Sequence, residues 1–228
     1  MIPKSIAIIP DGNRRLARRL GRDPWKGHEW GVRKLYRVLE WCREAGIQRV
    51  TFYALSLENL RRRPKQELQF LFALARSELD AILSDRAHFI HRNKVRLTFF
   101  GCLHLLPRDL REKIGQVAEA TRKYRHYRAH IALAYGGRQE ILDAATRLAQ
   151  ARERATEQSF RKHLQTNGAG DPDLIIRTGG EQRLSNFLLF QSAYSELAFL
   201  KTSWPALTRR QFLRAIQNFS LRERRFGK

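Results

Sequence analysis

The stretch at residues 6–15 restricts the fold of this chain more than any other. Residues 6–9 form a continuous apolar run rich in isoleucine, which is typical of a strand buried on both faces of a sheet. Pro10 ends the run, and an acid, a glycine, an amide and two arginines follow at once. Because open α/β sheets bind ligands outside the carboxyl ends of their strands, we expect a binding site directly after this strand.

The residue types that follow the strand suit a phosphate ligand. Gly12 lets the backbone approach a ligand closely, and Asn13 or a neighbour is expected to cap a helix whose first amide groups face an anion. Arg14 and Arg15 supply donors that match phosphate oxygens, and Asp11 can hold a Mg2+ ion that binds the phosphate. An ordinary turn with solvated arginines fits the same residues, so the local pattern leaves both interpretations open.

Length and charge restrict the class of protein. The 228 residues suffice for one large domain with a full core, and no linker or repeat divides residues 1–228. Lysine and arginine number 44 against 22 acids, and the net charge of +22 requires an anionic partner: nucleic acid, anionic lipid head groups or phosphorylated substrates.

No apolar run could span a bilayer, the N-terminus resembles a strand rather than a signal peptide, and the two cysteines lack metal spacing. We therefore expect a cytoplasmic protein.

Strand and helix patterns alternate along the chain. The expected strands cover residues 6–9, 50–55, 95–101, 129–135, 174–180 and 197–200, and the expected helices cover about residues 29–45, 64–83, 109–123, 136–151, 156–164 and 208–219. This alternation predicts a single α/β domain with a central, mainly parallel six-stranded sheet flanked by helices. The helix at 64–83 has more apolar residues than one stripe requires, so it is either deeply buried or lines an apolar cavity.

Four expected loops follow strand ends and carry groups that bind phosphate or metal. They are residues 11–15, the polar and basic stretch 56–63, residues 136–138 and residues 177–183. In a parallel sheet these ends lie on one edge, so the groups converge there. The convergence favours an anionic substrate more strongly than any one motif does.

The motifs at these positions resemble those of the cis-prenyltransferases, the undecaprenyl diphosphate synthase family, which includes the dehydrodolichyl diphosphate synthases. The resemblance runs in order over essentially the whole chain, and its most specific stretch is residues 177–196. It implies a homodimer with a shared active site, and a fold that encloses an apolar tunnel. It also implies condensation of isopentenyl diphosphate with an allylic diphosphate, in which each new double bond is Z. The Asp-rich DDxxD motif of the trans-prenyl synthases is absent.

The resemblance also assigns roles to individual residues. It assigns catalysis to Asp11, Asn59 and His28; substrate binding to Gly12, Asn13, Arg14, Arg15, Ser56, Arg63, Arg177, Arg183, Ser185, Arg225 and Gly227; Mg2+ binding to Asp11 and Glu196; and the tunnel wall to Ala54, Leu55, Leu71 and Leu74. Glu196 and the C-terminal pair would serve the neighbouring subunit across the dimer interface. Pro24 occupies a position that is often a phosphate-binding arginine, so Arg22 or Lys26 is the expected substitute.

Some of these assignments have a simpler interpretation. Arg177 with Glu196 fits a structural ion pair, and His28 fits an ordinary loop histidine. The group that takes up the departing proton is left unassigned.

The expected activity is elongation of an allylic primer, farnesyl or geranylgeranyl diphosphate, to a medium- or long-chain Z-polyprenyl diphosphate for a glycan lipid carrier. Ala54 is small, which leaves the tunnel open near its mouth. The alternatives are a short-chain Z-prenyl diphosphate synthase and a catalytically silent partner subunit of a heteromeric enzyme. Nucleic acid is not an expected partner, because no basic motif with interleaved aromatics is present. The excess positive charge would instead hold the enzyme peripherally against an anionic membrane.

Overall fold

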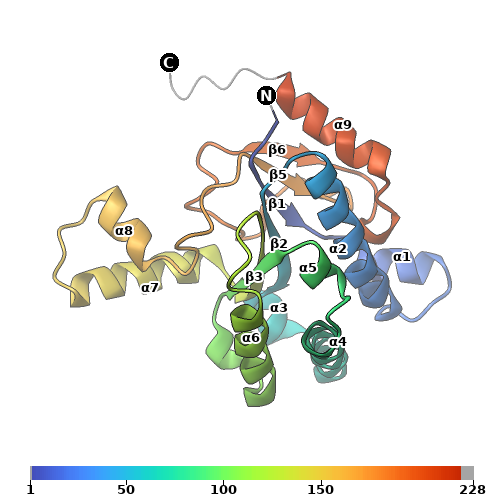
Figure 1. Ribbon diagram of the computed structural model, residues 1–228, viewed down its shortest axis with the longest axis horizontal. Helices are drawn as coiled ribbons and strands as arrows, with labels where there is room; N and C mark the ends of the chain where they lie inside the picture. Colours follow the sequence, from blue (N-terminus) through green and yellow to red (C-terminus); the bar gives the residue numbers. More distant parts are fainter. Residues whose placement is uncertain (1, 222–228) are drawn as a thin grey trace.

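A six-stranded parallel sheet forms the centre of the computed structural model, which describes residues 2–221 (Figure 1). The strands are β1 (Ser5–Ile9), β2 (Arg49–Ser56), β3 (Val95–Phe100), β4 (Tyr127–Tyr135), β5 (Leu174–Arg177) and β6 (Glu196–Phe199). The helices are α1 (Asn13–Arg19), α2 (Lys26–Glu44), α3 (Leu57–Arg62), α4 (Lys65–Ser84), α5 (Phe89–Arg92), α6 (Arg108–Ala120), α7 (Gly137–Gln150), α8 (Glu157–His163) and α9 (Arg209–Ser220), with short 3-10 turns at Leu103–Leu105 and Trp204–Ala206. The expected single α/β domain is confirmed.

The order of the strands shows where a sheet of this type is expected to bind a ligand. The order is β3-β4-β2-β1-β5-β6, and every pairing between these strands is parallel. The chain leaves β1 towards β2 on one side and leaves β5 towards β6 on the other. The crevice between the carboxyl ends of β1 and β5 is therefore the topological switch point, where sheets of this type bind ligands. All five residues of β1 are buried, as the apolar run predicts.

The two faces of the sheet are covered unequally. The larger apolar core lies on the face packed by α2, α4, α6 and α9, and it includes Ile6, Ile8 and Phe52. A smaller core on the other face gathers around Tyr135 and Phe187. Figure 1 shows α7 and α8 projecting to the left, away from the sheet. On that second face, residues 165–169, which form turns rather than a helix, lie across from Arg96 of β3 and Arg128 of β4.

Local capping explains where the structure departs from the expected elements. Residues 57–62 form α3 rather than a loop, because the Ser56 hydroxyl accepts a hydrogen bond from the Asn59 backbone N–H and caps the helix. Helix α5 was not expected. Few residues of α4 are buried, so its apolar surplus does not come from a deeply buried position. Within residues 2–221, no helix is long and apolar enough to cross a membrane.

Candidate active site

The carboxylate of Asp11 lies at the switch point and is held by two arginines. Arg177, the last residue of β5, donates to Asp11 Oδ2 at 2.8 Å, and Arg15 lies 3.2 Å from Oδ1. The Gly12 backbone N–H also donates to Oδ1, at 2.6 Å. Ser185 accepts a second hydrogen bond from Arg177, at 2.7 Å, which fixes that guanidinium in the crevice. One carboxylate therefore faces two guanidiniums where the central strands end.

This arrangement keeps Asp11 ionised. Burial alone would raise the pKa of the Asp11 carboxyl. The hydrogen bond and charge of Arg177, the charge of Arg15 and the Gly12 N–H outweigh that cost, and together they hold the pKa below its ordinary value. The negative charge that a cation would need is therefore present near neutral pH.

Glycines bring α1 and α2 close to the end of β1. Gly12 precedes α1 with a φ of 97°, and a Cβ on it would lie 2.8 Å from Ser203 Oγ. Gly27 of α2 lies so near α1 that a Cβ there would stand 2.2 Å from the Asn13 carbonyl oxygen. Asn13 is the first residue of α1 and does not cap it; its side-chain amide instead donates to the Pro10 carbonyl at 3.1 Å.

Glu67, a buried acid that was not predicted from the sequence, contacts three of the predicted site residues. The side chain of Glu67, on α4, is only 1% exposed and accepts a hydrogen bond from Arg63 at 2.9 Å. Its carboxylate also lies 3.3 Å from His28 Nε2 and 3.4 Å from Arg14. Two predicted phosphate ligands, Arg14 and Arg63, and one predicted catalytic residue, His28, thus share a single anchor. The sequence signal was an acid four residues after Arg63, in the first turn of a helix rich in apolar residues.

The His28 ring is neutral in this setting. Burial and the Arg63 charge lower its pKa to about 4, and the contacts with Glu67 only partly oppose that shift. At neutral pH His28 is therefore a hydrogen-bonding group without charge.

One cavity of about 710 Å³ joins these groups. It brings together the predicted residues Asp11, Gly12, Asn13, Arg14, Arg15, His28, Ala54, Ser56, Asn59, Arg63, Arg177 and Ser185. Tyr53, Glu58, Arg18 and Asn186 also line it, although none of them was predicted. Asn186 donates to Glu58 at 2.6 Å and so connects the loop after β5 to α3. The predicted convergence of four loops is borne out for three of them; the loop at 136–138 does not line this cavity.

A smaller apolar cavity of about 170 Å³ adjoins the first and shares Pro10, Asn13, His28 and Ala54 with it. The predicted tunnel residues Leu55, Leu71 and Leu74 line this second cavity. Ala54 sits at an irregularity in the pairing of β2 with β4. A bulge next to a binding site redirects side chains, and here it leaves Ala54 exposed between the polar and apolar spaces.

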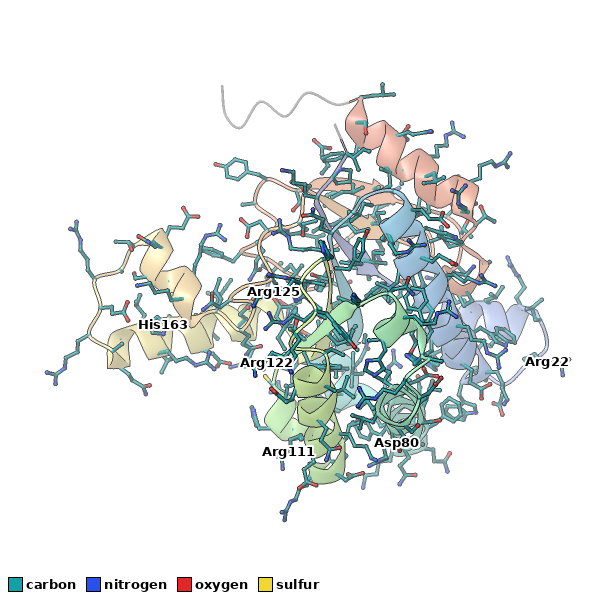
Figure 2. The ribbon with its side chains drawn as sticks, viewed as in Figure 1. Arg22, Asp80, Arg111, Arg122, Arg125 and His163 are labelled. Carbon is teal, nitrogen blue, oxygen red and sulfur yellow. The ribbon has the colours of Figure 1, made fainter. Side chains whose placement is uncertain are left out.

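The remaining predicted residues lie elsewhere. The side chain of Arg183 is 61% exposed and pairs with Glu181 rather than lining the cavity. Glu196 is the first residue of β6 and lines a groove between that strand and α9. It lies where the strands of the sheet begin, whereas Asp11 follows the end of β1. Arg225 and Gly227 fall outside the described residues. Arg22, labelled at the right-hand edge of Figure 2, does not line the cavity, and neither does Lys26.

The donors present fit a magnesium ion that is shared with a substrate. Within residues 2–221 no group of three or more His, Cys, Asp or Glu side chains could hold a metal by itself. Mg2+ usually binds one or two carboxylates together with substrate phosphates and water. The ionised, partly exposed carboxylate of Asp11, in a cavity rich in guanidinium groups, meets that requirement.

The fold and the cavity together define a parallel α/β protein with an arginine-rich pocket at the switch point. Residues 9–227 match the family described as putative undecaprenyl diphosphate synthase. The chain belongs to this family and is thus a cis-type prenyltransferase.

Individual relatives and solved structures cover nearly the whole chain. The tritrans,polycis-undecaprenyl-diphosphate synthase (geranylgeranyl-diphosphate specific) of Methanopyrus kandleri is 47% identical over 100% of this chain and 85% of the relative. The enzyme of the same name from Pyrococcus horikoshii is 43% identical over 100% of this chain and 88% of its own length.

Two crystal structures share the fold. That of a probable undecaprenyl diphosphate synthase from Campylobacter jejuni has a TM-score of 0.84 and 36% identity, covering 99% of each chain. That of lavandulyl diphosphate synthase from Lavandula x intermedia, in complex with dimethylallyl diphosphate, has a TM-score of 0.91 and 31% identity, covering 100% of this chain and 99% of the other.

Proposed function

We propose that the protein extends geranylgeranyl diphosphate by successive additions of isopentenyl diphosphate, and that the product is a medium- or long-chain Z-polyprenyl diphosphate for a glycan lipid carrier. The observation that carries the proposal is the junction of the polar cavity with the apolar one at Ala54 and His28. A diphosphate head and a growing hydrocarbon chain need those two environments side by side. The primer named for the archaeal relatives supports the choice of geranylgeranyl diphosphate.

In the proposed reaction, the allylic carbon–oxygen bond breaks and pyrophosphate departs. The double bond of isopentenyl diphosphate attacks the allylic carbon, and loss of a proton then forms the new double bond. Arg14, Arg15 and Arg63 would bind the departing phosphate oxygens, and Gly12, which has no side chain, would let the backbone approach them closely. Arg177, Ser185 and Arg183 would hold isopentenyl diphosphate. His28 and Asn59 would lie beside the reacting carbons.

Asp11 would hold Mg2+ together with the substrate phosphates, and Glu196 of a second copy would complete that site. The bound ion would supply stabilisation for the charge that develops on pyrophosphate. The charges of Arg15 and Arg177 beside Asp11 keep that carboxylate ionised and oriented.

A primer comparison tests the proposal. Purified protein receives Mg2+, labelled isopentenyl diphosphate and equal amounts of geranylgeranyl, farnesyl or dimethylallyl diphosphate in separate reactions. We expect the highest kcat/KM with geranylgeranyl diphosphate and products several units longer than the primer. A preference for dimethylallyl diphosphate with a single addition would favour the short-chain alternative.

Product length should respond to residue 54. Each CH2 group that enters an apolar space gains about 0.8 kcal/mol, so growth continues until the space is full. Ala54 lies exposed where the two cavities meet, and a larger side chain there would narrow the passage. We expect Ala54→Leu to shorten the products while the first condensation survives. An active Ala54→Leu enzyme with an unchanged product distribution would show that the chain does not pass this residue.

The active site is proposed to be shared between two copies of the chain. Within one chain, Glu196 begins β6 and lies at the amino edge of the sheet, whereas Asp11 follows the carboxyl edge. The two acids therefore do not meet within a subunit, and β6 is an edge strand that pairs only with β5 in the part of the chain that the structure describes.

Hybrid dimers test this sharing. Mixing Asp11→Ala chains with Glu196→Gln chains should restore part of the activity that each variant lacks alone, because one of the two sites in the hybrid keeps both acids. Subunit exchange is verified by mass. Exchange without any recovery of activity would mean that each chain builds its own site.

We further propose that the enzyme works in the cytoplasm and touches anionic membranes peripherally. The net charge of +22 supports electrostatic attraction to such a surface. The presence of Asp11 and Arg177 in one cavity argues against a silent partner subunit.

A further inference from the structure

A second cavity lies beside β3 and the first part of β4, on the sheet face that carries the smaller core. It has a volume of about 290 Å³ and is lined by Arg96, Thr98, Phe99, Phe100, Arg128 and His130, with residues 165–169 across it. Arg96, Arg128 and His130 lie in the first halves of β3 and β4, and Phe99 and Phe100 end β3. The catalytic cavity instead lies at the ends of β1, β2 and β5. The two cavities share no lining residue.

Strand register places three arginines in one row beside this cavity. Arg96 of β3 is paired with Arg128 of β4, and Arg128 is paired in turn with Arg49 of β2. Neighbouring strands are about 4.8 Å apart, and like charges placed directly opposite one another destabilise a sheet. Within residues 2–221, no ion pair or side-chain hydrogen bond to a protein group balances any of these three guanidiniums, and all three are half-buried. The row is therefore a local concentration of uncompensated positive charge.

A buried histidine beside the row has an unused donor. His130 is only 4% exposed, and its Nδ1 lies 2.5 Å from the Thr98 hydroxyl. With that hydroxyl donating to Nδ1, the neutral ring carries its proton on Nε2, which has no hydrogen-bond partner among the described residues. Nε of Arg49 is likewise buried without a partner there. Buried donors in native proteins are rarely left unsatisfied, because each costs free energy.

The charges of the arginines act on the same ring. Burial lowers the pKa of His130 to about 4, and the charges of Arg128, Arg49 and Arg96 add to that shift. Among residues 2–221, the charged side chains that shift the pKa of His130 are all arginines. A ligand that accepts hydrogen bonds and carries negative charge would relieve both the repulsion along the row and the unused donors.

We propose that this cavity is a binding site for a small phosphate-bearing anion, separate from the site of prenyl transfer. Guanidinium groups match phosphate oxygens in geometry and charge, and the Nε2–H of His130 supplies a neutral donor beside them. The volume is at the lower end for a ligand pocket and suits inorganic phosphate or a small phosphorylated molecule. This site is independent of the proposed polyprenyl product, because none of its residues takes part in that reaction.

The His130 ring reports occupancy directly. Protein with isotopically labelled histidine is titrated with inorganic phosphate at pH 7.5, and the His130 resonances are assigned by their loss in His130→Gln. We expect a saturable shift of these resonances in the unsubstituted protein. The shift should persist in Arg15→Gln, which removes a guanidinium from the catalytic cavity. In Arg128→Gln, the dissociation constant for phosphate obtained from the titration should be at least tenfold higher.

Thermal unfolding provides the second measurement. Without phosphate, Arg128→Gln should unfold at the same temperature as the unsubstituted protein or higher, because the substitution removes like-charge repulsion. Sodium chloride at matched ionic strength controls for screening. The proposal would be overturned if phosphate did not shift the His130 resonances. An equal response in Arg128→Gln, or an equal response to chloride, would overturn it as well.

Discussion

Asp11→Ala should lower kcat by about two to three orders of magnitude, because a carboxylate that holds a metal on a departing phosphate is worth several kcal/mol in the transition state. The structure adds a second reason. Loss of this carboxylate also removes the partner acid of Arg177, whose side chain is 6% exposed and donates to Asp11 at 2.8 Å. Turnover is measured with allylic and isopentenyl diphosphates at saturating Mg2+.

Two controls separate loss of chemistry from loss of fold. Asp23→Ala removes an exposed acid from the nearby loop after α1 and should leave turnover unchanged. The melting temperature of Asp11→Ala shows whether the fold persists, since Arg177 retains its hydrogen bonds to Ser185 and to the Arg183 carbonyl. A folded Asp11→Ala enzyme with near-normal turnover would contradict the metal assignment.

Glu67→Ala should destabilise the fold by about 3 to 5 kcal/mol, the usual cost of removing one partner from a buried ion pair. Glu67 is almost fully buried, and Arg63, His28 and Arg14 all meet its carboxylate. Without it, two guanidiniums would lie close together beside a buried imidazole. The free energy of unfolding is measured by urea titration.

Matched variants on the same helix sharpen this prediction. Glu67→Gln keeps the shape and one acceptor, so it should cost less than Glu67→Ala. Asp80→Ala on α4, at the surface site labelled in Figure 2, breaks an exposed pair with Lys113 and should cost less than about 1 kcal/mol. Equal losses for Glu67→Ala and Asp80→Ala would show that the buried cluster does not stabilise the fold.

Much of the fold follows from local sequence. The apolar run at residues 6–9 predicted a central buried strand, and alternation of strand and helix patterns predicted the parallel sheet that places Asp11, Ser56 and Arg177 on one edge. The surplus apolar residues of α4 left two interpretations open, and the structure favours the cavity wall because few of them are buried.

Other features depend on three-dimensional proximity that a single sequence does not contain. An acid four residues after Arg63 is typical of an ordinary surface pair, and only packing shows that Glu67 is buried and reaches His28 from another helix. The arginine row depends on the register between β2, β3 and β4. Arg183 was assigned to substrate binding by resemblance, yet its side chain is 61% exposed and pairs with Glu181.

Product stereochemistry tests the central claim most directly. Purified protein is incubated with Mg2+, geranylgeranyl diphosphate and carbon-13-labelled isopentenyl diphosphate, and the configuration of each new double bond is determined by NMR. The account predicts incorporation of several units, all with Z double bonds, and loss of incorporation in Asp11→Ala. New double bonds of E configuration, or no incorporation by folded protein under these conditions, would contradict it.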